Sequence, residues 1–322
     1  YRARGYGQHL LFYLLRCWVA ARYAKVIVTL SSRSAELLPF YIRYGFRIEG
    51  ASGRRYDDSS IEYVLAKHLI YQCITPDNVQ RFIERFCRVI LLLDQTDAFT
   101  QPEHWFFPPS NTNVNMAWDS TASQPSLTLR TSDGAISRRY SIQTLEAIFY
   151  PARFALTGRA AYLIPIQPQW AERMLQFSMT QPKLWQEVDS LLLRTDNVYY
   201  CHPRYLPDVL EGAPVLFYVS KPEMALAGMA RILDCRVASP EELFLEFSDL
   251  GIYGLEDIRN HVKISGKDKG SAMALRFGWW VPFPNPIHKD RLKDFGATHP
   301  QTISSIPYEK FEALMAAGGI EW

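Results

Sequence analysis

The alternation of hydrophobic and polar residues predicts closely spaced helices and short strands in the first quarter of the chain. The expected elements, in order, are a helix at 8–21, a strand at 25–30, a helix at 34–44, and strands at 46–49 and 60–67. Gly45 follows the second helix directly, where a C-terminal glycine is expected. This order of elements is typical of an α/β layer.

The middle of the chain predicts one more helix and a hairpin. Residues 76–93 have an amphipathic pattern that begins with Pro76, and residues 100–124 are rich in Pro, Asn, Ser and Thr, which indicates an irregular connection. Two strands at 126–130 and 136–142 flank a turn that contains Asp133 and Gly134, and a short helix is expected at 142–149.

The last part of the chain has a different pattern. Short apolar runs, separated by helical or loop segments, occur at 161–166, 215–219, 227–233 and 272–277. They predict a small β-barrel decorated with helices. The chain as a whole is therefore expected to be α+β, in three parts: residues 1–72, a connecting region 73–158 that contains the helix and hairpin, and residues 159–322.

Composition fits an ordinary globular protein. The chain has 322 residues, 48% of them hydrophobic and 21% charged, which favours two or three domains. No apolar run reaches the roughly 18 residues of a membrane span, and the first residues do not read as a signal peptide, so we expect a cytoplasmic protein without membrane association. The five cysteines are scattered, which suits a reducing compartment and indicates neither a disulfide framework nor a zinc site.

The net charge of +2 is unevenly distributed. Residues 1–72 contain eleven Lys and Arg against five Asp and Glu, so the amino-terminal part is basic and the remainder is slightly acidic. A phosphate-rich ligand would favour the amino-terminal part.

A glycine-containing motif stands at the start of the first helix. Residues 2–7 read RARGYG and fit the pattern R-x-x-G-x-G, in which backbone N–H groups at a helix start form an anion site suited to a pyrophosphate. One strand further on, residues 35–46 read AELLPFYIRYGF. Together the two segments resemble the carboxy-terminal half of a GNAT acetyltransferase domain.

The GNAT resemblance implies acetyl-CoA as the cofactor, and it implies that Tyr41 is the general acid that protonates the departing thiolate, with Tyr44 as the nearby alternative. By the same resemblance, the cofactor would be held by Arg2, Arg4, Gly5, Tyr6, Gly7 and Gln8. The half of the domain that normally precedes this motif is not in the sequence. Three explanations stay open: the chain is a fragment, a second polypeptide completes the sheet, or the half-domain is a degenerate remnant.

Three stretches of the last part resemble ASCH domains, which are PUA-like small barrels associated with RNA or modified nucleotides. They comprise residues 162–175, residues 214–220 with 228–232, and residues 283–287. Gln167 stands where amidohydrolases of this group have a lysine, so the resemblance favours binding over hydrolysis. The nucleic-acid-binding residues expected from their charge or flat rings are Arg194, Tyr199, Tyr218, Ser220, Lys221, Arg231, Arg276, Trp279 and Trp280.

Other motifs are weaker. Residues 265–270 lack the first glycine of a phosphate-binding loop, and the adjacent residues Cys201 and His202 do not by themselves form a nucleophile and base. The histidines show no metal-binding spacing, so no metal is expected.

Two functions follow from these resemblances. The first is an acetyl-CoA-dependent N-acetyltransferase that modifies an amine of an RNA or nucleoprotein recruited by the PUA-like part. The alternative is a non-enzymatic nucleic-acid-binding or regulatory protein, of the toxin–antitoxin or phage-defence kind, with a degenerate GNAT half-domain.

Overall fold

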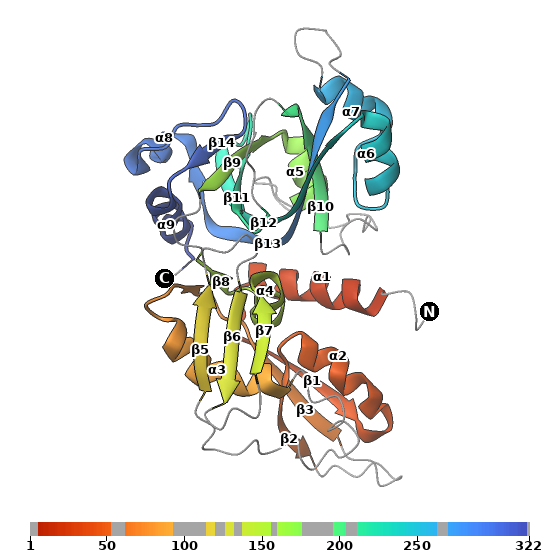
Figure 1. Cartoon of the computed structure of the whole chain (residues 1–322), viewed down its shortest axis with the longest axis vertical. Coiled ribbons are helices and arrows are strands. Elements are labelled where there is room, and N and C mark those ends of the chain that lie inside the picture. The colour runs from red at the N-terminus through yellow and green to blue at the C-terminus, as the bar shows by residue number, and fades with distance from the viewer. Residues whose placement is uncertain are drawn as a thin grey trace. The chain divides into compact units, whose positions relative to one another are not determined.

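The structure is a computed structural model, and the contacts within it divide the chain into two compact units. One contains Tyr1–Ala21 and Thr157–Glu321, and the other contains Arg22–Leu156 and Trp322 (Figure 1). The residues that the structure describes are 6–52, 62–92, 114–119, 126–131, 137–155, 160–175, 196–203, 211–262 and 270–320. The two units are described separately below, and are called the 22–156 unit and the 157–321 unit.

The 22–156 unit contains a three-stranded antiparallel sheet in the order β1-β3-β2. Its strands are β1 (Lys25–Ser31), β2 (Arg47–Ser52) and β3 (Glu62–His68). They confirm the three strands that the sequence predicts here. Val, Ile and Thr are concentrated in β1, where branched side chains suit a pleated surface.

The segment between β1 and β2 is a 3₁₀ turn, η1 (Ser32–Leu37), followed by helix α2 (Leu38–Arg43). Gly45 has a φ of +80° and its N–H donates to the Ile42 carbonyl at 2.8 Å, so a glycine ends this helix as predicted. A Cβ at this position would lie 2.0 Å from the Ile148 carbonyl oxygen, which excludes any larger residue.

The rest of this unit contains a three-stranded sheet, β5-β6-β7, a parallel pair of short strands, β4 and β8, and two helices. The elements are β4 (Cys73–Ile74), α3 (Val79–Leu92), β5 (Val114–Asp119), β6 (Ser126–Thr131), β7 (Ser137–Ser141), α4 (Ile142–Phe149) and β8 (Arg153–Phe154). The predicted hairpin is confirmed, because β6 pairs with β7 in antiparallel fashion. The prediction that residues 100–124 are irregular is wrong at β5, which adds a third strand by pairing with β6.

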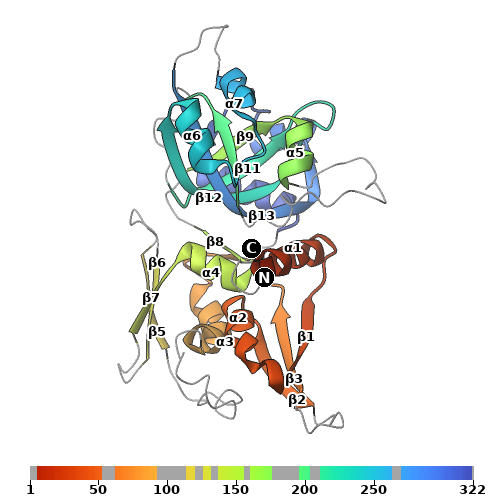
Figure 2. The same ribbon diagram turned by 90° about the vertical axis from the view of Figure 1, so that its right-hand side faces the viewer.

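The 157–321 unit is built on a six-stranded sheet in the order β10-β13-β12-β11-β9-β14. Its strands are β9 (Ala161–Ile166), β10 (Asp196–Cys201), β11 (Pro214–Val219), β12 (Ala225–Ala238), β13 (Ala272–His288) and β14 (Ser304–Ile306). The remaining elements are α1 (Tyr6–Ala20), α5 (Pro168–Leu175), α6 (Pro240–Phe247), α7 (Leu255–Val262), α8 (Lys289–Leu292), η6 (Lys293–Phe295) and α9 (Tyr308–Ala317). Helices α6 and α7 lie beside β12, β13 and β10 (Figure 2).

The sheet of this unit is open among the described residues, so the expected small β-barrel is corrected to an open mixed sheet. Strands β10 and β14 are its two edges. The long strands β12 and β13 shift register at several points, and such bulges bend a sheet without closing it. The α+β class that the sequence predicts is confirmed.

Helix α1 belongs to the 157–321 unit by its contacts. The Phe12 ring lies edge-on to the Trp279 ring at 5.0 Å, and Arg16 Nη2 donates to the Leu175 carbonyl oxygen at 3.4 Å. The sequence pattern instead predicts that this helix lies in one domain with β1 to β3. The residues that contact this helix lie more than 150 positions further along the chain. A local sequence pattern does not reveal such distant partners.

Candidate functional site

A cleft of about 280 Å³ opens in the 157–321 unit. It is formed where β9, β11 and β10 end and where the chain enters β14. The described residues that line it are Pro165, Gln167, Tyr199, Cys201, His202, Ser220, Gln301, Thr302 and Ile303. No Asp, Glu, Lys or Arg is among these lining residues, so the site offers hydroxyl, amide, thiol and imidazole groups.

The parallel pairing of β9 and β11 brings two lining residues together. Val219 lies opposite Ile166 in the register, so Gln167 and Ser220 both follow the strand ends at the same level. The Ser220 N–H donates to the Ile166 carbonyl at 2.9 Å and fixes this arrangement. Polar side chains after parallel strands therefore meet at one end of the sheet.

Tyr199 closes one wall of the cleft. Its hydroxyl donates a hydrogen bond of 3.0 Å to the Pro165 carbonyl oxygen, across the sheet from β10 to β9. Burial raises the pKa of the Tyr199 phenol well above its ordinary value of 10, with a smaller contribution from Cys201. Burial likewise raises the pKa of the Cys201 thiol. Both groups are therefore neutral near pH 7, and Cys201 is not an activated nucleophile.

Gln167 also lines the cleft. Its backbone carbonyl accepts the N–H groups of Trp170 and Ala171 as α5 begins, and its side-chain Oε1 accepts from Gln169 Nε2 at 3.2 Å. Gln167 therefore brings a side-chain amide to the cleft. From the sequence, Gln167 is notable only because it stands where related amidohydrolases have a lysine.

Two of the nine predicted nucleic-acid-binding residues, Tyr199 and Ser220, line this cleft. Lys221 is exposed and follows Ser220 directly. Arg194 lies outside the described residues. Three of the predicted residues therefore lie in or next to the same cleft.

The other predicted residues of this set have structural contacts. Arg231 is buried and its Nη1 donates to the Gly212 carbonyl at 2.7 Å, whereas Arg276 forms an ion pair with Asp196 at 2.5 Å. Trp279 packs against Phe12, as described above. Trp280 and Tyr218 are buried, Trp280 within the main core.

The lining residues Gln301, Thr302 and Ile303 were not singled out from the sequence. They precede β14, a strand of three residues that is too short to give a periodic signal. In the sequence, Cys201 and His202 are distinguished only by being adjacent. In the structure, both line the cleft.

The predicted acetyl-CoA motif lies partly outside the described residues, since Arg2, Arg4 and Gly5 are not described. Helix α1 begins at Tyr6, and Gly7 and Gln8 are exposed in its first turn. Tyr41 lies in α2 of the other unit, half-buried, with its ring edge-on to those of Phe40 and Phe46 at 5.3 and 5.4 Å.

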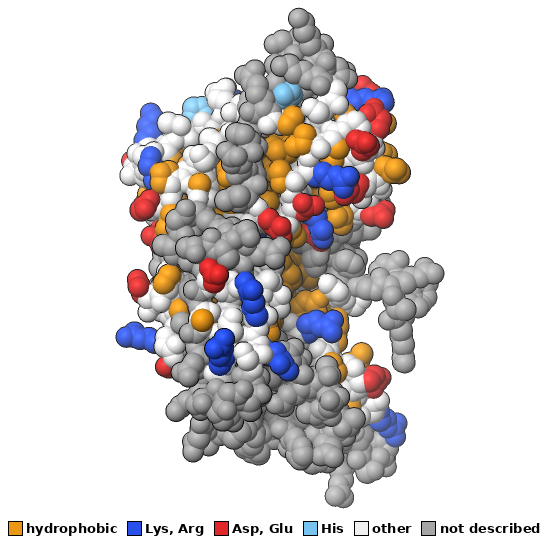
Figure 3. All heavy atoms as spheres, viewed as in Figure 1, with side chains coloured by type: hydrophobic (Ala, Val, Ile, Leu, Met, Phe, Trp, Pro, Cys, Tyr) orange, Lys and Arg blue, Asp and Glu red, His pale blue; other side chains and the backbone are white. Residues whose placement is uncertain are grey.

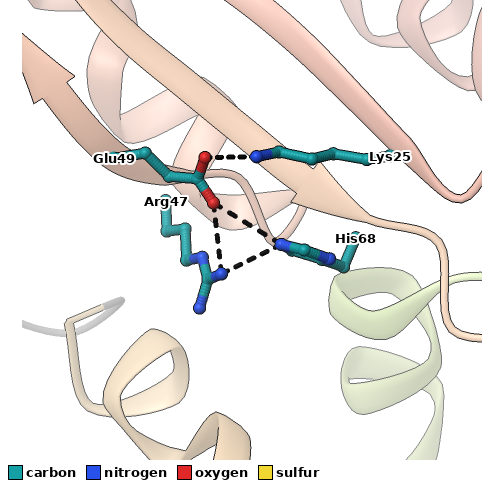
Figure 4. Close-up of polar contacts among 4 residues, drawn as sticks. All are labelled: Lys25, Arg47, Glu49 and His68. Carbon is teal, nitrogen blue, oxygen red and sulfur yellow. Dashed lines mark hydrogen bonds and ion pairs between the residues drawn. The ribbon is translucent and has the colours of Figure 1, made fainter.

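A polar cluster crosses the three-stranded sheet of the 22–156 unit (Figure 4). Glu49 on β2 accepts hydrogen bonds from Lys25 on β1 and from Arg47 at 3.1 Å, and His68 on β3 lies 3.5 Å away. The Lys25 hydrogen bond, followed by that of Arg47, lowers the pKa of Glu49. The Arg47 Nη2 and His68 Nε2 atoms lie 2.9 Å apart. Ion pairs between half-exposed side chains contribute little to stability. We therefore assign this cluster no catalytic role.

Lys67 is a buried amine in the same unit. Its Nζ donates to the carbonyl oxygens of Tyr44 at 2.7 Å and Ile148 at 2.6 Å, where α2 and α4 end. Complete burial lowers the pKa of Lys67 to about 7. A neutral amine has two N–H groups, which match these two acceptors.

Two further kinds of feature are absent from the described part of the chain. No group of three or more His, Cys, Asp and Glu side chains is arranged to hold a metal ion. None of the described helices combines the length and apolar character that a membrane span requires.

Comparison with known proteins gives a partial likeness. No protein-family model matches the sequence, and no curated protein matches it at a significant level. Solved structures of the ASCH protein of Zymomonas mobilis, including two single-residue variants, match about half of the chain. The unmodified protein is 16% identical, with 48% of this chain and 94% of that chain covered and a TM-score of 0.38, and one variant covers 49% and 98% with the same identity and score.

Proposed function

We propose that this protein binds nucleic acid, and that the cleft of the 157–321 unit holds one unpaired base of a single-stranded RNA. The observation that carries the proposal is the lining of the cleft: neutral hydroxyl and amide groups around a space of about 280 Å³. Proteins read unpaired RNA bases through hydrogen bonds to the base edges. The volume is at the lower end of ligand sites, which span about 300–1,000 Å³, and suits one base.

Groups that flank the cleft support a polymeric ligand. Lys221 is exposed beside Ser220, and the Arg173 guanidinium lies 5.8 Å from the Trp170 ring on α5, the helix that begins after Gln167. Cations near a base site serve the phosphates of the ligand. On the face shown in Figure 3, acidic and basic side chains are interspersed over the described part of this unit. We therefore propose that RNA contacts the surface around the cleft and not a broad basic face.

Anisotropy of labelled RNA tests the proposal. A short single-stranded RNA, the matching DNA and an RNA duplex are titrated with the protein and with two variants, Ser220→Ala and Thr302→Val. Loss of one hydrogen bond weakens single-strand binding about two- to tenfold in each variant. The exposed residue Ser305 on β14 provides the matched control, Ser305→Ala, which retains affinity. Absence of binding by the unaltered protein, or equal affinity for all three variants, contradicts the proposal.

Acetyl transfer is the second candidate, in which acetyl-CoA binds the motif of residues 2–8, Tyr41 acts as general acid, and a second polypeptide completes the sheet of β1 to β3. The observation that favours it is the open first turn of α1: among the described residues outside this turn, no atom lies within 4 Å of a Cβ built at Gly7. Calorimetry with acetyl-CoA on the unaltered protein and on Gly7→Leu tests this candidate. Binding that the substitution abolishes supports it, and absence of binding favours the non-enzymatic function.

A further inference from the structure

Strand β1 is one edge of the three-stranded sheet in the 22–156 unit, and its outer side pairs with no described strand (Figure 2). Its ladder with β3 is antiparallel and continuous. The Leu69 N–H donates to the Ala24 carbonyl at 3.0 Å where this ladder begins. Hydrogen-bonded pairs alternate along such a ladder, so the even-numbered residues of β1 are bonded to β3. The backbone N–H and C=O groups of Lys25, Ile27 and Thr29 therefore point away from β3.

The two edges of this sheet differ in how they are protected against pairing. Natural sheets protect an edge with bulges, prolines or charged side chains. Strand β2 has a register shift after Ile48 and two charged residues, Arg47 and Glu49. Strand β1 has no proline and no register shift, and its one charged residue, Lys25, bonds to Glu49 on its own sheet. Of the two edges, β1 is therefore the one suited to accept another strand.

Exposed apolar surface accompanies this edge. Ile27 is 59% exposed, and Tyr23, just before the strand, is 56% exposed, whereas Val26 is 7% exposed. Removing apolar surface from water favours association. An extended partner strand would satisfy the outward backbone groups and cover Ile27 in a single contact.

We propose that β1 pairs in antiparallel fashion with β1 of a second copy of this chain. A twofold axis beside Ile27 sets this residue against its own copy, and sets Lys25 against Thr29 of the second copy. Both pairs join residues whose backbone groups point outward, and neither sets like charges opposite each other. The same patch serves on both copies, as a closed symmetric dimer requires. The cleft belongs to the other unit, so this inference is independent of the proposed RNA binding.

Sedimentation velocity measures the association. One strand against one strand is a small contact compared with the roughly 800 Å² per partner of a standard interface, so a dissociation constant of roughly 10–100 μM is expected. Between about 1 and 300 μM, the unaltered protein is therefore expected to change from monomer to dimer.

Two matched variants locate the contact. Ile27→Lys sets like charges opposite each other at the centre of the pairing, and is expected to weaken the dimer roughly tenfold. Leu245→Lys is the control, because it places the same charge at a residue that is 82% exposed in the other unit. The control is expected to leave the dissociation constant unchanged.

Hydrogen exchange of single amides in the unaltered protein identifies the edge without any variant. The amides of Lys25, Ile27 and Thr29 are expected to exchange slowly only at high protein concentration. Those of Val26 and Val28 bond to β3, so they are expected to exchange slowly at every concentration. This alternation distinguishes strand pairing from association through any other surface.

Each other outcome overturns the inference. A protein that stays monomeric up to about 300 μM does so directly. A dimer that is unaffected by Ile27→Lys in a folded variant, or that forms without protecting the outward amides, shows that the copies associate elsewhere. Slow exchange of the outward amides at every concentration shows that another segment of the same chain covers the edge.

Discussion

The Tyr199 hydroxyl and the Pro165 carbonyl oxygen lie 3.0 Å apart, although three strands separate their own strands in the sheet. Strand β10 is one edge, and β9 is next to the other edge. The sheet must therefore be strongly curved, and the register shifts in the long strands β12 and β13 allow that curvature. The cleft lies beside this hydrogen bond, because Tyr199 and Pro165 both line it.

Removing the Tyr199 hydroxyl is expected to destabilise the 157–321 unit. Tyr199→Phe keeps the ring but leaves the Pro165 carbonyl without this donor, which costs about 1–3 kcal/mol. Hydrogen exchange of the β9 and β10 amides measures the change. The exposed Tyr23 provides the control, because Tyr23→Phe is expected to stay within about 0.5 kcal/mol. Equal exchange in the two variants would show that the bond adds no stability.

The described cysteines are expected to differ in reactivity. Cys201 is buried and burial raises the pKa of its thiol, whereas Cys17 is exposed on α1. Since the thiolate is the reactive form, iodoacetamide at pH 8 should modify Cys17 and leave Cys201 unmodified in the folded protein. Peptide mass spectrometry measures the two sites, and denaturant should abolish the difference. Rapid native modification of Cys201 would contradict the burial described here.

The sequence predicts the bounds of a helix or strand well where a single residue or a single pattern determines them. The bounds of β9 are predicted without error, and Gly45 ends α2 because no other residue tolerates its backbone and surroundings. Strands β12 and β13 extend beyond their predicted apolar runs. Their additional residues include Asp234 and Arg236, whose polar side chains interrupt the apolar pattern although the backbone continues to pair.

The candidate site was only partly predictable, because it depends on which distant residues meet. Arg231 and Arg276 look like phosphate ligands by composition, yet Gly212 and Asp196 from other parts of the chain engage them. Thr302 joins the cleft because β14 pairs with β9, and nothing near Thr302 in the sequence indicates that pairing.

A buried ion pair should matter more than an exposed one in this chain. Glu146 accepts from the Phe154 N–H at 2.9 Å and lies 3.9 Å from Arg153, with both side chains almost fully buried. Glu146→Ala is expected to cost about 3–5 kcal/mol, because a buried cation loses its counter-ion. Glu246→Ala, which breaks the exposed pair with Arg236, should cost less than about 1 kcal/mol. Urea denaturation compares the two, and similar losses would contradict the assignment.

Lys67 should make the 22–156 unit more stable as the pH rises above neutrality. Its pKa is about 7 in the folded chain and has the ordinary value of 10.5 when unfolded. Between these values the unfolded state binds the proton and the folded state does not, so the free energy of unfolding rises with pH, by at most about 1.4 kcal/mol per unit. Below pH 7 both states bind the proton and this slope vanishes.

The variant Lys67→Met isolates this contribution. It leaves the Tyr44 and Ile148 carbonyls without the amine, so it is expected to be less stable at pH 9, where the neutral amine is the favoured form. Its stability should lack the Lys67 slope between pH 7.5 and 9, while contributions from other titrating groups are common to both proteins and cancel in the difference. Hydrogen exchange of the β3 amides, corrected for the intrinsic effect of pH, gives the two curves. Parallel curves would mean that Lys67 does not change protonation in this range, and that the charged amine is accommodated by the two helix ends.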